Sequence, residues 1–264
     1  MSNSSHPLSI LVTGAAGGLG KTIATAYLDK GHNVTICDVH EERLDATSKL
    51  WTESYPGRFI IKKADVASQL EIDSLVEDIV KRFGRLDVLV NNAAVLDKFH
   101  PAGTCSQEMW DRILRVNLTG AFVCTKAAVN TMLVQSPPGG SIINMGSNAS
   151  VCGIDGGLAY LVSKHGVLAL TRNTAAFYLE KNITCTMLQL GGLAATNIQD
   201  SLVEGVDMEG LGLIEKHMPG FNYGINDVPL EDVAKLCLFL SDRSIAKTMN
   251  GALVPFNRNW PAGH

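Results

Sequence analysis

ILVTGAAGGLG, residues 10–20, joins a short apolar run to a turn rich in glycine. The apolar letters predict a buried strand, and the residues from about 19 to 30 predict the helix that follows it. Glycines between a strand and a helix allow a tight turn, and the first N–H groups of the helix are free to bind a pyrophosphate. The stretch therefore predicts a nucleotide-binding turn, with a purely structural turn as the alternative.

The second predicted strand, NVTICD at 33–38, ends in Asp38, 18 residues after Gly20. An acid at about this distance binds the hydroxyls of an adenosine ribose. A 2′-phosphate at ~4–5 Å from the carboxylate would be repelled by roughly 3–4 kcal/mol at an effective dielectric of ~20. We therefore expect NAD rather than NADP as the cofactor. The alternative is that Asp38 is a solvated acid at the end of a strand.

Short apolar runs alternate with helical stretches along the rest of the chain. Further strands are predicted at 58–66, 85–92, 141–147, 183–190 and 251–256, and helices near 70–83, 107–134, 158–180 and 228–240. Nearly all-apolar strands that alternate with helices indicate a parallel sheet covered on both faces. We expect a single α/β domain over residues 1–264, doubly wound, in which residues 191–228 break the alternation and form a flap over a site.

Composition excludes several classes of partner. The chain has 264 residues and a formal net charge of −4, without a basic tract for nucleic acid. No apolar run reaches the ~18–20 residues of a membrane span, and no secretory signal is visible. The six cysteines have no CxxC spacing and none lies near a histidine at ligand spacing, so we expect free thiols, no metal site and a reducing, cytoplasmic location.

AYLVSKHG, residues 159–166, places Tyr160 four residues before Lys164, on one face of a helix. Oxidation of an alcohol needs a base that is active near neutral pH, whereas tyrosine keeps its proton to about pH 10. An ammonium ~4 Å from a phenolate, at an effective dielectric of ~20, supplies roughly the 3–4 kcal/mol that such a shift requires. The pair therefore predicts an activated tyrosine, and a plain pair on a helix surface is the alternative.

Together these motifs resemble the short-chain dehydrogenase/reductase family. The resemblance rests on TGAAGGLG (13–20), NNAA (91–94), Asn117 in RVNLTG, Ser147 in INMGS and YLVSK (160–164), in the family's order and spacing. It implies a Rossmann-type sheet of about seven parallel strands with helices on both faces. It also implies nicotinamide chemistry and a homodimer or homotetramer formed through the helices near 107–134 and 158–180.

The resemblance also implies roles for single residues. The catalytic set is Asn117, Ser147, Tyr160 and Lys164. Ser147 would hydrogen-bond the substrate oxygen, Asn117 would bind a water that links Lys164 to solvent, and Lys164 would hold the nicotinamide ribose. The residues implied to bind the cofactor are Gly14, Gly18, Leu19, Gly20, Asp38, Asp65, Val66, Asn92, Tyr160, Lys164, Leu193 and Thr196.

The sequence departs from the family pattern in three places. Ala94 replaces a glycine, Gly146 replaces the first of two serines, and Leu190 stands where a proline is expected. Thr196 also falls one residue late. We therefore expect the segment after the sixth strand to follow a looser path beside the nicotinamide.

Residues 191–228 are rich in apolar side chains and contain no arginine that could clamp a carboxylate or phosphate. We expect a neutral, mainly apolar secondary alcohol or ketone, such as a terpenoid, steroid-like, polyketide or aromatic compound of secondary metabolism. The apolar residues could instead pack the flap onto the body. Asn148 and Asp155 could each contact a substrate hydroxyl or be hydrated loop residues. Two other functions stay open: a non-catalytic NAD-binding partner or regulatory protein of the same fold, and a cofactor-dependent isomerase.

Overall fold

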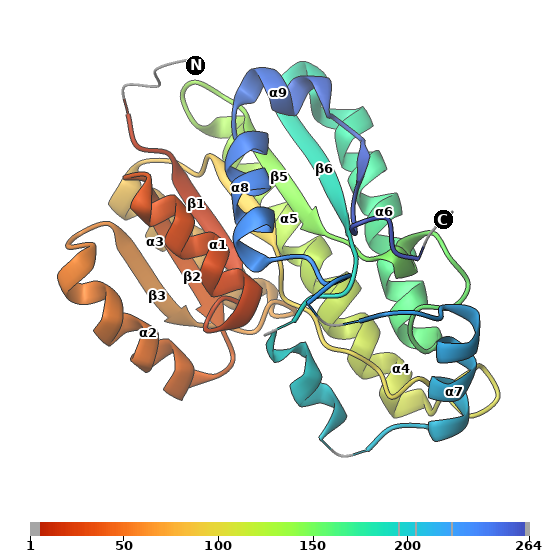
Figure 1. Cartoon of the computed structure of the whole chain (residues 1–264). Coiled ribbons are helices and arrows are strands. Elements are labelled where there is room, and N and C mark those ends of the chain that lie inside the picture. The colour runs from red at the N-terminus through yellow and green to blue at the C-terminus, as the bar shows by residue number, and fades with distance from the viewer. Residues whose placement is uncertain (1–5, 195, 204, 223, 262–264) are drawn as a thin grey trace.

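The computed structural model describes residues 6–194, 196–203, 205–222 and 224–261, and within these residues seven strands form one parallel sheet (Figure 1). The order is β3-β2-β1-β4-β5-β6-β7, and every pairing is parallel. The strands are β1 (Ser9–Thr13), β2 (Asn33–Asp38), β3 (Phe59–Lys63), β4 (Val88–Asn91), β5 (Gly140–Met145), β6 (Ile183–Leu190) and β7 (Leu253–Phe256). This confirms the predicted doubly wound, Rossmann-like α/β fold.

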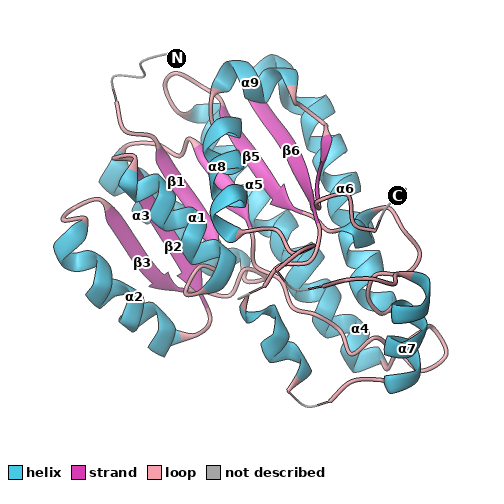
Figure 2. Cartoon of the chain, in the orientation of Figure 1, coloured by secondary structure: helices cyan, strands magenta, loops and turns pink. Residues whose placement is uncertain are grey.

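Helices cover both faces of the sheet because its strands are apolar on both sides. Along β1, Ile10 and Val12 pack into one apolar cluster and Leu11 into another, as the alternation of side chains in a strand requires. The first cluster includes α1 (Gly18–Asp29), α2 (Glu41–Ser54) and α8 (Leu230–Leu240). The second includes α3 (Gln69–Phe83), α5 (Ala121–Val134) and α6 (Leu158–Tyr178). Figure 2 shows the sheet between these two layers.

The strand order fixes where a site can form. The chain moves outward from β1 to β3 and then returns to place β4 on the other side of β1. The loops that leave β1 and β4 therefore diverge at the carboxyl edge of the sheet, and a crevice opens between them. The predicted nucleotide-binding turn follows β1 and lies at this crevice.

The helical region predicted at 107–134 is divided in the structure. It consists of α4 (Gln107–Leu114), a π-helical turn η1 (Arg115–Gly120) and α5. A Cβ at Gly120 would lie 2.5 Å from Val66 Cγ2, so glycine allows the turn to approach the segment after β3. A π-helical turn inserts a residue into the helix and redirects the side chains that follow. The sequence pattern contained no signal for this change of pitch.

Residues 191–228 contain two short helical segments, η4 (Asn197–Leu202) and α7 (Met208–His217), while positions 195, 204 and 223 lie outside the described residues. Asp207 begins α7 by accepting the N–H of Gly210 at 2.7 Å, and its other oxygen lies 2.9 Å from His100 Nδ1. These contacts attach α7 to the loop that follows β4. The remaining short elements are η2 (Asn148–Ser150), η3 (Leu179–Lys181) and α9 (Arg243–Thr248), and α9 was not predicted.

None of the helices in the described ranges combines the length and the apolar character that a membrane crossing requires. All six cysteines are free, and four of them are buried, as the scattered spacing predicts.

Candidate active site

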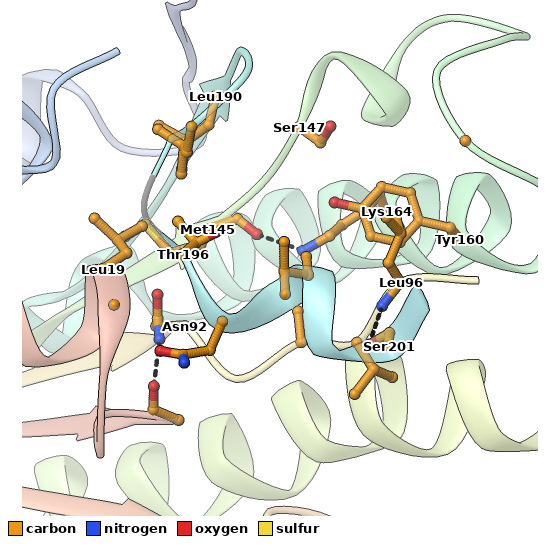
Figure 3. Close-up of a pocket in the computed structure, with 18 of the residues that line it drawn as sticks. Leu19, Asn92, Leu96, Met145, Ser147, Tyr160, Lys164, Leu190, Thr196 and Ser201 are labelled. Carbon is orange, nitrogen blue, oxygen red and sulfur yellow. Dashed lines mark hydrogen bonds between the residues drawn. The ribbon is translucent and has the colours of Figure 1, made fainter. Parts of the chain in front are cut away.

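A cleft of about 1180 Å³ opens at the carboxyl edge of the sheet. It is lined by the glycine turn, the ends of β2, β4, β5 and β6, and parts of the segment 190–221. With the exception of Asn117, every residue predicted to belong to the site lines this cleft: Gly14, Gly18, Leu19, Gly20, Asp38, Asp65, Val66, Asn92, Ser147, Tyr160, Lys164, Leu193 and Thr196. Figure 3 shows several of them converging from separate elements.

The glycine turn after β1 has a conformation that requires glycine. Gly14 and Gly18 have φ values of 61° and 50°, in the left-handed region that other residues avoid. A Cβ at Gly14 would lie 2.6 Å from Ala93 Cα. The side chain of Asn92 donates to the carbonyl oxygens of Thr13 and Gly14, both at 2.9 Å, and so fixes the turn against β4. The turn forms a backbone cradle at the start of α1, and Asn197 of η4 lies against it, because a Cβ at Gly17 would be 2.5 Å from Asn197 Oδ1.

Asp38 lies at the end of β2 beside this cradle. Its carboxylate accepts the N–H groups of Ala16 and His40, each at 3.1 Å. Arg43 forms an ion pair with Asp200 of η4 at 2.7 Å, and both side chains line the cleft. The pair therefore connects α2 to the 191–228 segment across the opening.

Asp65 and Val66 follow β3 and line the same end of the cleft. Val66 is buried, and the carboxylate of Asp65 accepts hydrogen bonds from the backbone of Ala67 and the guanidinium of Arg115. The Arg115 contact was not predicted, because the two residues are joined only by the tertiary structure.

Leu193 and Thr196 line the cleft although the sequence departs from the family pattern at Leu190. The Oγ1 atom of Thr196 is buried and has no hydrogen-bond partner among the described residues. A buried hydroxyl without a partner costs free energy unless a ligand satisfies it. Thr196 also lies against Gly18, where an added Cβ would be 3.3 Å from its Cα. A glycine cradle with an unsatisfied hydroxyl beside it fits the polar parts of a dinucleotide.

Tyr160 and Lys164 lie one turn apart on α6 and are both buried (Figure 3). The Nζ atom of Lys164 donates to the carbonyl oxygen of Met145 at 3.0 Å and lies 5.5 Å from the centre of the Tyr160 ring. Met145 is the last residue of β5, and Ser147 follows it two residues later. The structure thus brings the predicted serine, tyrosine and lysine together at the end of β5.

Burial shifts the pKa values of both Tyr160 and Lys164. Burial raises the pKa of Tyr160 above its usual value, and the carboxylate of Asp155 raises it further. Burial also lowers the pKa of Lys164 to about 8. The Lys164 ammonium donates to the Met145 carbonyl oxygen, and activation of Tyr160 by Lys164 stays a prediction.

Asn117 does not line the main cleft, and its side chain is already engaged. The amide oxygen accepts the N–H of Val95 at 2.8 Å, and the amide nitrogen donates to the Val95 carbonyl and to Ser163 Oγ. Asn117 therefore fixes the loop after β4 to α6. It does border a second cavity of about 10 Å³, shared with Met145 and Lys164, whose volume is about that of one water probe.

The sequence pattern did not predict Asp97 as a site residue. In the structure its side chain is almost completely buried. It accepts the N–H of Gly157 at 2.8 Å, that of Tyr160 at 2.9 Å and that of Phe99 at 3.2 Å. The carboxylate thus caps the N-terminus of α6 from the loop after β4. The sequence did show that a capping group was needed. GIDGGL at 153–158 places glycine at the N-cap of α6 and has no serine, threonine or asparagine there, so the acceptor for the first N–H groups must come from another segment.

Asn148, by contrast, is an internal residue. It donates to the backbone oxygen of Trp260 at 3.0 Å and accepts from the side chains of Gln189 and Asn257. This network holds Trp260 beside Ser147, and the Trp260 ring packs edge to face on Phe221 with centroids 4.7 Å apart. Both rings line the cleft, as does Phe99. None of these three aromatic residues was predicted as a site residue.

No cluster of three or more His, Cys, Asp or Glu side chains suited to a metal occurs in the described part of the chain. The chemistry available in the cleft is that of hydroxyl groups, carboxylates, the Lys164 amine, the His40 imidazole and the guanidinium groups of Arg43, Arg112 and Arg115.

Comparison with known proteins decides the family, because the model of the short chain dehydrogenase family matches residues 9–207. The chain belongs to the short-chain dehydrogenase/reductase family. It is thus an oxidoreductase of a family that uses nicotinamide cofactors, as its motifs predicted.

Similar proteins support this assignment over nearly the whole chain. A short chain dehydrogenase/reductase of Colletotrichum higginsianum, dpchG, is 41% identical over 251 residues, which cover 95% of this chain and 92% of the relative. The 3beta-hydroxysteroid dehydrogenase 2 of Eggerthella lenta is 29% identical over 252 residues, covering 96% and 94%.

Solved structures agree with the fold. The crystal structure of levodione reductase has a TM-score of 0.84 and 25% identity, covering 97% of this chain and 98% of that one. A gluconate 5-dehydrogenase from Burkholderia cenocepacia, in complex with NADP and tartrate, has a TM-score of 0.80 and 23% identity, covering 97% and 96%.

The cap on α6 gives a first prediction. Replacement Asp97→Ala leaves three backbone N–H groups without their acceptor, so we expect the free energy of unfolding to fall by about 2–4 kcal/mol. Urea titration measures this loss. The matched control is Asp111→Ala, which removes an exposed carboxylate of α4 and should cost less than about 0.5 kcal/mol. Equal stability of the two variants would show that the cap has no energetic role.

Proposed function

We propose that the protein is an NAD-dependent dehydrogenase or ketoreductase that acts on a neutral, mainly apolar secondary alcohol or ketone. The observation that carries the proposal is the meeting of Ser147, Tyr160 and Lys164 in one cleft with the glycine cradle. A cofactor-binding protein without activity would have no physical need for a buried ammonium beside a buried phenol.

In the cofactor half of the cleft, the glycine turn and the start of α1 would hold the pyrophosphate. Asp38 would bind the adenosine ribose, and its negative charge supports NAD over NADP. Asp65 and Val66 would border the adenine, while Asn92, Leu193 and Thr196 would lie beside the nicotinamide end. The nicotinamide ring, when bound, accepts or delivers the hydride.

Residues of α6 and of the loop after β5 would carry out the proton transfer. Ser147 would hydrogen-bond the reacting oxygen and stabilise the charge that develops there. The raised pKa of Tyr160 keeps the phenol protonated, so Tyr160 carries the proton that a carbonyl oxygen would take up on reduction. In the oxidative direction, the positive charge of an oxidised nicotinamide would add to that of Lys164 and favour the phenolate. The cavity between Asn117 and Lys164 would hold the water of a proton relay.

The substrate half of the cleft supports an apolar ligand. We propose that residues 191–228 form a substrate flap, to which Leu211, Ile214, Met218 and Phe221 contribute cleft-lining side chains. Trp260 closes the same region from the C-terminal stretch. The name of the related 3beta-hydroxysteroid dehydrogenase describes an apolar secondary alcohol as that protein's substrate, and this supports the same class here.

We also propose a homodimer or homotetramer formed through α5 and α6. Both helices carry large apolar side chains that one chain leaves uncovered. Phe122 and Val134 of α5 are 49% and 84% exposed, and Phe177 of α6 is 74% exposed. Exposed apolar groups gathered on long helices are typical of an oligomer interface.

Tyr160→Phe tests the proposed acid/base. The variant should bind NADH as the wild type does, because the ring remains, but turnover should fall by at least about a thousandfold because no proton can be exchanged. Absorbance at 340 nm with apolar secondary alcohols measures turnover, and NADH fluorescence measures binding. Tyr178→Phe, on the same helix outside the cleft, is the control. Normal turnover by Tyr160→Phe would remove Tyr160 from the mechanism.

Asp38→Asn tests the cofactor preference. The amide oxygen can still accept one of the two backbone N–H groups, and the side chain carries no charge, so the ratio of kcat/KM for NAD to that for NADP should fall by about a hundredfold. Asp38→Ala should show the same relaxation with lower stability. Asp45→Ala, an exposed acid of α2, should leave the ratio unchanged. An unaltered ratio in both Asp38 variants would place the ribose elsewhere.

Introduction of charged side chains into the proposed interface tests whether the protein forms oligomers through α5 and α6. The double variant Phe122→Glu, Phe177→Glu should shift the protein to a smaller species, because burial of two carboxylates at an interface is unfavourable. Light scattering after size-exclusion chromatography measures the mass. Leu70→Glu changes a residue of α3 that is 82% exposed and serves as the control. A monomeric wild type, or a double variant of unchanged mass, would contradict this interface.

A further inference from the structure

Asp155 is a carboxylate in the cleft that the proposed reaction does not use. It lies in the loop between η2 and α6 and lines the cleft together with Ser147 and Tyr160. Its Oδ2 atom accepts the hydroxyl of Ser147 at 3.3 Å. Within the described residues, no lysine, arginine or histidine forms an ion pair with it. Burial raises the pKa of Asp155 to about 6, and hydrogen bonds from Ser147 and the Ala149 backbone oppose this rise.

Ser147 has only one hydroxyl hydrogen to share. Its oxygen accepts the N–H of Ala149 at 3.2 Å, and its hydrogen is directed to Asp155. If Ser147 donates to the reacting oxygen of a substrate, the same hydrogen must leave the carboxylate. Asp155 then loses a donor in a cleft whose nearby walls include Phe221 and Trp260. A substrate that brings its own donor to Asp155 avoids this loss.

We infer that Asp155 recognises a second hydroxyl group on the substrate, close to the carbon that is oxidised or reduced. The two hydrogen bonds are then exchanged without loss: the reacting oxygen takes the hydrogen of Ser147, and the second hydroxyl gives its hydrogen to Asp155. The reacting oxygen and the Asp155 carboxylate both lie within hydrogen-bond reach of the Ser147 hydroxyl, so they are close to each other. The second hydroxyl must therefore stand on the carbon adjacent to the reacting carbon or on the next one. The substrate class is an apolar 1,2- or 1,3-diol or the corresponding hydroxyketone. This inference rests on the proposed function.

The neighbours of Asp155 permit a test by pH. Cys152 and Tyr160 face the carboxylate and both have a raised pKa, while the pKa of Lys164 is lowered to about 8. Asp97, at the start of α6, also acts on Tyr160 but is held by three backbone N–H groups. Asp155 should therefore take up a proton near pH 6, well below the pH at which Cys152, Tyr160 and Lys164 titrate. The protonated carboxyl group is a weaker hydrogen-bond acceptor than the carboxylate.

The experiment compares 1-indanol with 1,2-indanediol and 1,3-indanediol as NAD-linked substrates of the wild type, of Asp155→Asn and of Glu215→Gln. The wild type should prefer a diol in kcat/KM by about ten- to hundredfold. The preference should largely disappear in Asp155→Asn, chiefly through KM, and should remain in Glu215→Gln, which changes an exposed carboxylate of the cleft. In the wild type and in Glu215→Gln, which both retain Asp155, the preference should decline below pH 6. Because each ratio is taken within one variant, a general loss of activity cancels.

Two results would overturn the inference and leave the proposed function intact: oxidation of 1-indanol and both diols at equal efficiency, or a diol preference that Asp155→Asn retains. Absence of turnover with all three alcohols would instead contradict the proposed function. In that case thermal shift of the NADH-loaded protein still decides the role of Asp155. A diol that stabilises the wild type no more than 1-indanol does would refute it, and a larger diol shift that is lost in Asp155→Asn would support it.

Discussion

The bond between the buried ammonium of Lys164 and the carbonyl oxygen of Met145 joins α6 to the end of β5, and the arrangement of the cleft depends on it. Burial of this amine is costly, since lowering its pKa to about 8 corresponds to roughly 3 kcal/mol. An apolar residue would be cheaper at this position. The bond places Ser147, two residues beyond Met145, opposite Tyr160, one turn before Lys164. A cation that is unfavourable for stability thus sets the relative position of two hydroxyl groups.

Two carboxylates around the start of α6 set the charge balance of this region. Asp97 receives three backbone N–H groups and fixes the first turn of the helix, whereas Asp155 receives the hydroxyl of Ser147. Both raise the pKa of Tyr160, and burial raises it more. The phenol is therefore the favoured form in the structure described, and a phenolate requires further positive charge. This makes the state of Tyr160 sensitive to whatever is bound in the cleft.

The cleft is enclosed by contacts between distant parts of the chain. Arg43 reaches Asp200 across the opening, His100 reaches Asp207 at the start of α7, and Asn148 holds the backbone of Trp260. The first contact is a partly exposed ion pair and the second joins a histidine to a carboxylate; both contribute little to stability but attach residues of the 191–228 segment to α2 and to the loop after β4. The third is buried and places an aromatic wall beside Ser147. Contacts from α2, from the loop after β4 and from the residue after Ser147 thus position described parts of 191–228 and the C-terminal stretch around the cleft.

The sequence by itself determined the sheet, the glycine turn and the tyrosine–lysine pair, because these follow from local patterns: apolar runs, glycines between a strand and a helix, and an i, i+4 pair. It gave the serine through the resemblance to the family. It could not show that η1 interrupts the helix at 115–120, because Gly120 is required there only by its approach to Val66. It also could not show Asp97 or Trp260 at the site, the hydrogen bond between Ser147 and Asp155, or the raised pKa of Tyr160. Those features depend on burial and on contacts between residues far apart in the chain, and such contacts exist only after the strands and helices have packed.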